Sequence, residues 1–99
     1  MTADVLIREA RASDIPALVG LLEVLFSIEA DFHFDAVRQR RGLELMLADS
    51  GARCVFVAEA DGTVVGMCSV QTFISTAEGA AAATVEDVVV LPAFLLMVV

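Results

Sequence analysis

Several residue types are absent or rare in this chain of 99 residues. It has no lysine, tryptophan or tyrosine, so all six positive charges are arginines, set against fourteen acidic residues and a net charge of −8. A protein that binds nucleic acid needs a basic face, so this balance argues against a nucleic-acid partner. The single histidine and the two cysteines, Cys54 and Cys68, match no metal-binding or redox spacing, so we expect free thiols and no metal site.

Long hydrophobic segments are also missing. The longest apolar run, Val88–Val99, contains Pro92 and is too short for a membrane-spanning helix, which needs about 20 residues. The first residues lack the basic and then apolar pattern of a signal peptide. We therefore expect a cytoplasmic protein with no membrane partner.

What is present predicts one folded domain. Hydrophobic residues make up 59% of the chain, which is more than a disordered segment contains. A chain of this length buries about 64% of its surface on folding, enough for one modest core and no second domain.

Helical patterns occupy the first half of the chain. A short strand is expected at Val5–Glu9, and Ser13 or Asp14 then offers a helix cap. Apolar residues recur at helical spacing as far as Phe26. A second helix is expected at Asp35–Ala48.

The second half alternates like strands. Asp61-Gly62 predicts a tight hairpin, followed by a return strand at Thr63–Ile74. A loop at Ser75–Ala82 and a last strand at Ala83–Leu91 complete the pattern. The predicted class is α+β, with an antiparallel sheet and two N-terminal helices in the order β-α-α-β-β-β.

Three features could carry chemistry, and each has a structural alternative. His33, between Phe32 and Phe34, is either a substrate contact beside an aromatic pocket or an exposed loop residue. Glu86, at the start of an apolar run, is either a general base or a solvated charge at a strand edge. Val88–Val90 is either a central strand or a strand whose backbone pairs with an extended ligand.

Three segments match a known pattern when they are read together. Ile7–Leu18 resembles the first strand and first helix entry of the GCN5-related N-acetyltransferase superfamily. Val57–Gly66 resembles its central hairpin, and Val85–Phe94 resembles its fourth strand and the approach to its cofactor loop. The resemblance covers Val5–Phe94, which corresponds to about the first half of a family domain.

The resemblance implies a role for each candidate residue. In the family, acyl-CoA lies against the fourth strand, whose backbone groups pair with the pantetheine arm; the matching residues are Val88, Val89 and Val90. Glu86 matches the place of a glutamate that some members use as the base for the acceptor amine. The loop between the first two helices often lines the acceptor site, which implies roles for Phe32, His33 and Phe34.

One part of the family pattern is missing. The family continues with an Arg/Gln-x-x-Gly-x-Gly/Ala loop that holds the pyrophosphate of CoA, whereas Phe94 is followed here by Leu95–Val99. We therefore expect residues 1–94 to be the N-terminal part of an acetyltransferase domain and residues 95–99 to be an atypical hydrophobic tail. We also expect a truncated product that binds acetyl-CoA weakly.

These observations favour one function and leave alternatives. The leading hypothesis is an enzyme that transfers an acetyl group from acetyl-CoA, as co-substrate, to a small-molecule or peptide amine, with weak or no activity from this chain alone. The first alternative is a non-catalytic half-domain that forms a homo-oligomer through its exposed sheet edge and tail. The second is an unrelated α+β binding module.

Overall fold

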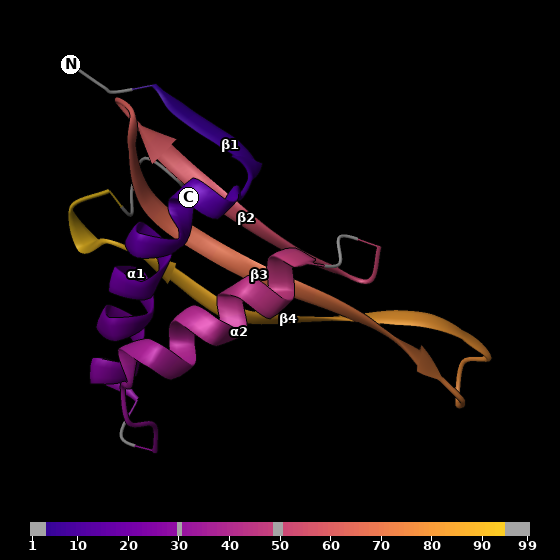
Figure 1. Ribbon diagram of the computed structural model, residues 1–99. Helices are drawn as coiled ribbons and strands as arrows, with labels where there is room; N and C mark the ends of the chain where they lie inside the picture. The colour runs from indigo at the N-terminus through magenta and orange to yellow at the C-terminus, as the bar shows by residue number, and fades with distance from the viewer. Residues whose placement is uncertain (1–3, 30, 49–50, 95–99) are drawn as a thin grey trace.

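A computed structural model describes residues 4–29, 31–48 and 51–94 (Figure 1). The elements follow in the order β1 (Val5–Glu9), α1 (Ile15–Ile28), α2 (Ala36–Ala48), β2 (Arg53–Ala60), β3 (Thr63–Ser75) and β4 (Ala80–Val90). Short 3₁₀ helices lie at Ala12–Asp14 and Pro92–Phe94. The predicted fold class and element order are confirmed.

The four strands form one antiparallel sheet in the order β1-β2-β3-β4, and both helices cover the same side of it (Figure 1). The core lies between the two layers, where every second side chain of the strands packs against the apolar faces of the helices. Its buried members are Ile15, Leu18, Leu21, Leu22, Leu43, Val55, Val57, Met67 and Val89.

The turn between β2 and β3 forms as the sequence predicts. Asp61 and Gly62 have φ angles of 51° and 81°, the left-handed conformations that a two-residue hairpin turn requires. Further along β3, Gly66 lies so close to β4 that an added Cβ would be 3.2 Å from Val90 Cγ2 and 3.3 Å from the Val89 carbonyl oxygen. The hairpin and this close approach hold β2, β3 and β4 in a fixed register.

The turn between β3 and β4 is shorter than the sequence predicts. The expected loop at Ser75–Ala82 is wrong, because β3 continues to Ser75 and β4 already begins at Ala80. Alanine has a low preference for strands, but Ala81 and Ala82 pair here with Ile74 and Phe73 and so complete the backbone ladder. The β3–β4 hairpin consequently extends well past the helices (Figure 1).

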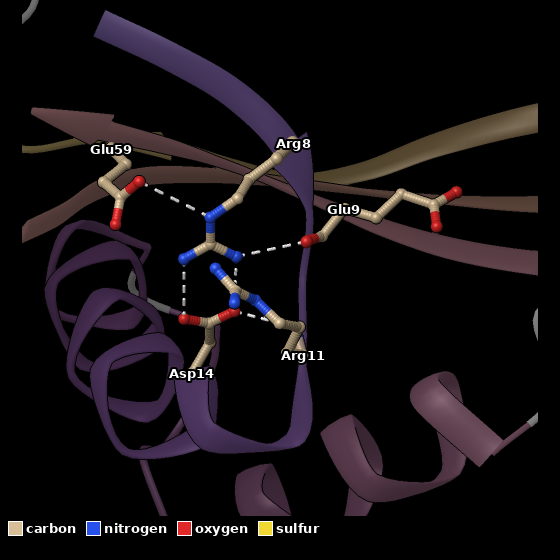
Figure 2. A network of polar contacts seen from close by, with 5 residues as sticks. All are labelled: Arg8, Glu9, Arg11, Asp14 and Glu59. Carbon is tan, nitrogen blue, oxygen red and sulfur yellow. Dashed lines mark hydrogen bonds and ion pairs between the residues drawn. The ribbon is translucent and has the colours of Figure 1, made fainter. Parts of the chain in front are cut away.

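A network of ion pairs joins β1 to the start of α1 and to β2 (Figure 2). The two terminal nitrogens of Arg8 donate to the two carboxylate oxygens of Asp14 at 2.8 and 3.0 Å, and the backbone N–H of Arg11 donates to the same carboxylate at 2.7 Å. Arg8 Nε lies 3.6 Å from a carboxylate oxygen of Glu59. The Arg8 guanidinium lowers the pKa of Asp14, and the Asp14 carboxylate raises that of Arg8. The network fixes the angle at which α1 leaves the sheet.

Candidate functional site

A cavity of about 350 Å³ lies between the two helices and the sheet. We call it the helix–sheet pocket. Its walls are apolar and come from Leu22 and Phe26 of α1 and from Leu43 and Met46 of α2. Its polar lining consists of Arg38, Gln39, Arg53, Ser69, Gln71 and Asp87. An apolar cavity with a few convergent polar groups is the usual form of a small-molecule site.

Asp87 reaches this pocket because β4 is irregular at that residue. The register of β3 and β4 passes from Met67 opposite Val89 to Ser69 opposite Glu86, so the strand contains one extra residue. Asp87 has a φ of 41°, a left-handed conformation that aspartate adopts more readily than most residues. The buried Ser69 hydroxyl donates to the Asp87 carboxylate at 3.2 Å. The bulge therefore directs the Asp87 carboxylate towards the pocket.

Glu86, the residue predicted to be the base, lies at the margin of the same pocket. Paired residues of an antiparallel ladder share a face, and Glu86 is paired with the pocket residue Ser69. Its side chain is exposed and does not line the cavity. In a regular strand two consecutive side chains point to opposite faces, whereas the bulge gives Glu86 and Asp87 access to one side. The structure thus places two carboxylates where the sequence analysis assigned a role to one.

The loop between the helices lies beside the pocket rather than in it. Phe32 is 54% exposed, and its ring stacks on that of the pocket residue Phe26 with a centroid distance of 5.3 Å. His33 is exposed and Phe34 is half-buried, and neither lines the cavity. Of the three predicted acceptor contacts, Phe32 therefore has a described connection to the pocket.

The predicted acyl-CoA strand forms one edge of the described sheet, because β3 is the only described strand that pairs with β4. The N–H of Leu91 donates to the Val65 carbonyl at 2.9 Å. Since backbone groups alternate along a strand, the N–H and C=O of Val89 point to β3, and those of Val90 point to the open edge. Within the run Val88–Val90, Val90 therefore offers its backbone to a ligand.

The side chains of the same run divide between the two faces of the sheet. Val89 is buried in the core, whereas Val88 and Val90 lie on the face away from the helices. With Ile7 and Phe56 they line a small, almost wholly apolar hollow of about 150 Å³ there. Val88 and Ile7 are 59% and 58% exposed, so this face is largely uncovered in the described part of the chain.

None of the six polar residues of the pocket received a role from the sequence, and three of the six are charged. Arg38 and Arg53 lie on different elements and line one pocket because α2 packs on β2, which no local pattern predicts. Asp87 follows Glu86 directly, and a regular strand would place the two side chains on opposite faces. An irregularity in strand period is the one sequence signal that could have indicated Asp87, and it is hidden in a run of valines.

Metal and membrane sites find no support in the described residues. No group of three or more His, Cys, Asp or Glu side chains there could hold a metal ion. No helix of the described chain is long and apolar enough to cross a membrane. Cys54 and Cys68 are free, as predicted, and both are half-buried. Desolvation raises the pKa of the Cys54 thiol, so it is a poor nucleophile at neutral pH.

The hydrophobic tail and the missing pyrophosphate loop concern residues 95–99, which lie outside the described residues. The expected weak binding of acetyl-CoA and the boundary after residue 94 therefore stay predictions.

The comparison with known proteins gives structural neighbours but no close relatives. No family model and no curated protein matches the sequence. A possible acetyltransferase from Clostridium difficile 630 has a TM-score of 0.81 and 19% identity over 92% of this chain and 60% of its own. An aminoglycoside N-acetyltransferase in complex with CoA has a TM-score of 0.78 and 18% identity over 96% and 60%. Glucosamine-6-phosphate N-acetyltransferase from Arabidopsis thaliana has a TM-score of 0.67 and 22% identity over 93% and 63%.

These neighbours establish the fold and its extent. At this level of identity the similarity shows a shared architecture and carries no activity with it. The chain spans 60 to 63% of the length of the three neighbours, while nearly all of it is matched. The resemblance seen in the sequence is confirmed: the chain has the fold of the N-terminal part of a GCN5-related N-acetyltransferase domain.

Proposed function

We propose that this chain forms the N-terminal part of an N-acetyltransferase that transfers the acetyl group of acetyl-CoA to a primary amine held in the helix–sheet pocket. The observation that carries the proposal is the β4 bulge, which gives two consecutive carboxylates access to the pocket side of an open strand edge. The chain also shares its fold with acetyltransferases, two of which are described as acting on an aminoglycoside and an amino-sugar phosphate. This shared fold is a second argument for the proposed acetyl transfer.

The chemistry requires a proton acceptor next to an amine. The amine nitrogen forms a bond to the acetyl carbonyl carbon, the carbon–sulfur bond breaks, and CoA leaves as a thiolate. Before or during this step the amine loses a proton, which passes to a carboxylate and from there to solvent. Glu86 is the base predicted from the resemblance, and Asp87 is the carboxylate that lines the pocket. In this proposal Asp87 holds the amine.

Acetyl-CoA would lie along the open edge of β4. The Val90 N–H and C=O point to that edge and suit the amide groups of a pantetheine arm, which would extend the ladder as an added strand. The bulge at Asp87 interrupts the β3–β4 ladder only one residue before Val88, so the strand edge and the pocket carboxylate adjoin. This arrangement supports the predicted assignment for Val90, while the backbone of Val89 is taken up by β3.

The test uses the protein that its gene encodes. Thiol release from acetyl-CoA is followed with a chromogenic thiol reagent in the presence of a panel of primary amines. We expect amine-dependent release of CoA. If no amine raises the rate above that of acetyl-CoA alone, the proposal is wrong.

Two variants separate the carboxylates. Asp87→Asn and Glu86→Gln each remove one charge at nearly constant volume, and asparagine tolerates the left-handed backbone of residue 87. Loss of the residue that accepts the proton should lower kcat about 10²-fold or more. Glu78→Gln is the control, because Glu78 is exposed in the β3–β4 turn, far from the bulge. Equal activity of Glu86→Gln and the control would contradict the role predicted for Glu86.

Self-association is the alternative function, and one observation favours it. The exposed valines Val85 and Val88, 60% and 59% exposed, stand next to the open edge of β4. An apolar strand edge of this kind is a template for another chain. The homo-oligomer predicted from the sequence would form in this way, and the cytoplasmic location stays a prediction under either function.

A further inference from the structure

The cations around the helix–sheet pocket already have partners within the chain, whereas two carboxylates there belong to no ion pair among the described residues. Arg38 lines the pocket, and its Nε is 3.8 Å from an Asp35 carboxylate oxygen. Arg53, the other arginine of the lining, also has a partner of its own. Asp87 in the lining and Glu86 at the margin are in none of the described ion pairs. Counted together, two guanidinium groups face three carboxylates, so a ligand meets an excess of negative charge.

The Asp87 carboxylate is the charged group that the pocket offers to a ligand. Among the described residues its side-chain partner is the Ser69 hydroxyl, a neutral donor at 3.2 Å. Ser69 is 3% exposed, so this contact holds the carboxylate from the buried side. A carboxylate accepts more than one hydrogen bond, and the bonds that it accepts from a charged N–H donor are the stronger ones. The ammonium group of a primary amine supplies donors of this kind.

Most of the other polar groups of the lining are engaged within the chain. The Gln39 Oε1 atom accepts a hydrogen bond from the backbone N–H of Asp35 at 2.7 Å. With the two arginines and the Ser69–Asp87 pair also engaged, Gln71 is the polar residue of the lining that remains. Hydroxyl groups of a ligand would therefore lose water without gaining equivalent partners, which is unfavourable.

The walls of the pocket are apolar. They come from both helices, through Leu22, Phe26, Leu43, Leu45 and Met46. Leu22 and Leu43 are 5% and 4% exposed, so part of the wall is the core itself. The Phe26 ring stacks on that of Phe32, which extends the apolar surface to the loop between the helices. Apolar parts of a ligand leave water when they pack on these walls, and this contribution favours binding.

We propose that the acceptor is a small primary amine whose only charge is its ammonium group and whose remaining part is an apolar chain or ring. This inference rests on the proposed acetyl transfer. The ammonium group lies at Asp87, next to the open edge of β4, and the apolar part lies between α1 and α2. A cavity of about 350 Å³ fits a ligand of this type. This class differs from the aminoglycoside and the amino-sugar phosphate named for two structural neighbours.

Binding of matched ligands to this chain tests the inference without requiring catalysis. The backbone amides of Ser69 and Gln71 are followed by NMR while hexylamine, 2-(2-aminoethoxy)ethanol, 1-hexanol or 6-aminohexanoate is added. Hexylamine, the ether amine and the alcohol have the same number of non-hydrogen atoms, so the comparison changes the polarity of the chain or its charge. We expect hexylamine to shift these amides at a concentration about tenfold lower or more than the ether amine or the alcohol. 6-Aminohexanoate, which adds a carboxylate, should bind more weakly than hexylamine.

Variants then identify the groups that hold each end of the ligand. Asp87→Asn should weaken binding of hexylamine about tenfold or more and leave that of the uncharged 1-hexanol unchanged. Leu45→Gln should weaken binding of hexylamine about threefold or more, because it makes one wall polar at a residue that is 56% exposed and outside the core. Val37→Gln is the matched control, because Val37 is an exposed apolar residue of the same helix that does not line the pocket.

Several results would overturn the inference. They are equal binding of hexylamine and the ether amine, no binding of hexylamine, and stronger binding of 6-aminohexanoate than of hexylamine. Equal effects of Leu45→Gln and Val37→Gln, or equal effects of Asp87→Asn on the amine and the alcohol, would overturn it as well.

The acetylation assay distinguishes this result from the fate of the proposed function. If the protein acetylates hexylamine and the ether amine with equal kcat/KM, the acceptor class is wrong and the acetyl transfer stands. If hexylamine binds as expected and no amine is acetylated, the proposed function is wrong and the pocket specificity stands.

Discussion

The sharpest test of the described packing replaces Gly66 by alanine. The added methyl group would lie 3.2 Å from Val90 Cγ2, 3.3 Å from the Val89 carbonyl oxygen and 3.5 Å from the Ala58 Cβ. The Val90 side chain can turn aside, but the Val89 carbonyl belongs to a residue whose side chain is buried in the core, so it cannot move without disturbing that core. The variant therefore has to separate β3 from β4 at the site where the co-substrate is proposed to lie.

The size of this effect follows from two opposing contributions. Overpacking by one methyl group costs about 1–3 kcal/mol. Replacing glycine by alanine also restricts the unfolded chain, which raises the free energy of unfolding by about 0.4–1 kcal/mol. The net loss in the free energy of unfolding is about 1 kcal/mol, which lowers Tm by about 4–8 °C in a domain of this size.

Gly20→Ala is the matched control, because it makes the same chemical change in open space. Gly20 lies in α1 on an exposed surface, and an added Cβ there has no neighbour within 4 Å. Alanine at a helix interior is about 1 kcal/mol more favourable than glycine, so this variant should gain stability. Urea denaturation followed by circular dichroism at 222 nm measures both variants. If Gly66→Ala is as stable as Gly20→Ala, the close approach of β3 and β4 is wrong.

Two further predictions concern the ion-pair network and the assembly state. Because Arg8 lowers the pKa of Asp14 in the folded protein, their interaction stabilises the fold above the unfolded pKa of about 3.9 and is lost as the pH falls through the lower folded value. The urea midpoint of the wild type should therefore fall more steeply below about pH 5 than that of Asp14→Asn, and parallel curves would contradict this role. Light scattering at tens of micromolar should show a dimer or larger species, whereas a stable monomer would refute self-association through the β4 edge.

The parts of the fold that local chemistry determines could be predicted from the sequence. The Asp61-Gly62 turn needs two left-handed residues, and few dipeptides meet that need so well. A glycine within a predicted strand indicates a bulge or close packing, and Gly66 makes a close approach to β4. By contrast, the alanines after Gly79 have little intrinsic strand preference, and they become strand only because Phe73 and Ile74 are opposite them.

The candidate site was less predictable because tertiary packing assembles it. The resemblance led to Glu86 and to the valine run, which the structure places at the pocket margin and along the open edge. Arg38 and Arg53 line one pocket only when α2 packs on the sheet, and no local sequence pattern predicts that packing. Asp87 enters the pocket through a backbone irregularity, and a regular period of two predicts the opposite face for it.

Because of the irregularity in β4, Asp87 could be removed from the chain without changing the rest of the fold. Ser69 pairs with Glu86 and Met67 pairs with Val89, so Cys68 is left opposite both Asp87 and Val88. A chain that lacked Asp87 would set Cys68 opposite Val88 alone and would keep every other partner of the ladder unchanged. Asp87 is thus a one-residue insertion into β4 that leaves the strand pairing on both sides of it unchanged. Such an insertion can be gained or lost in a single codon event, and the same scaffold can then carry a pocket with or without this acid while the core stays as it is.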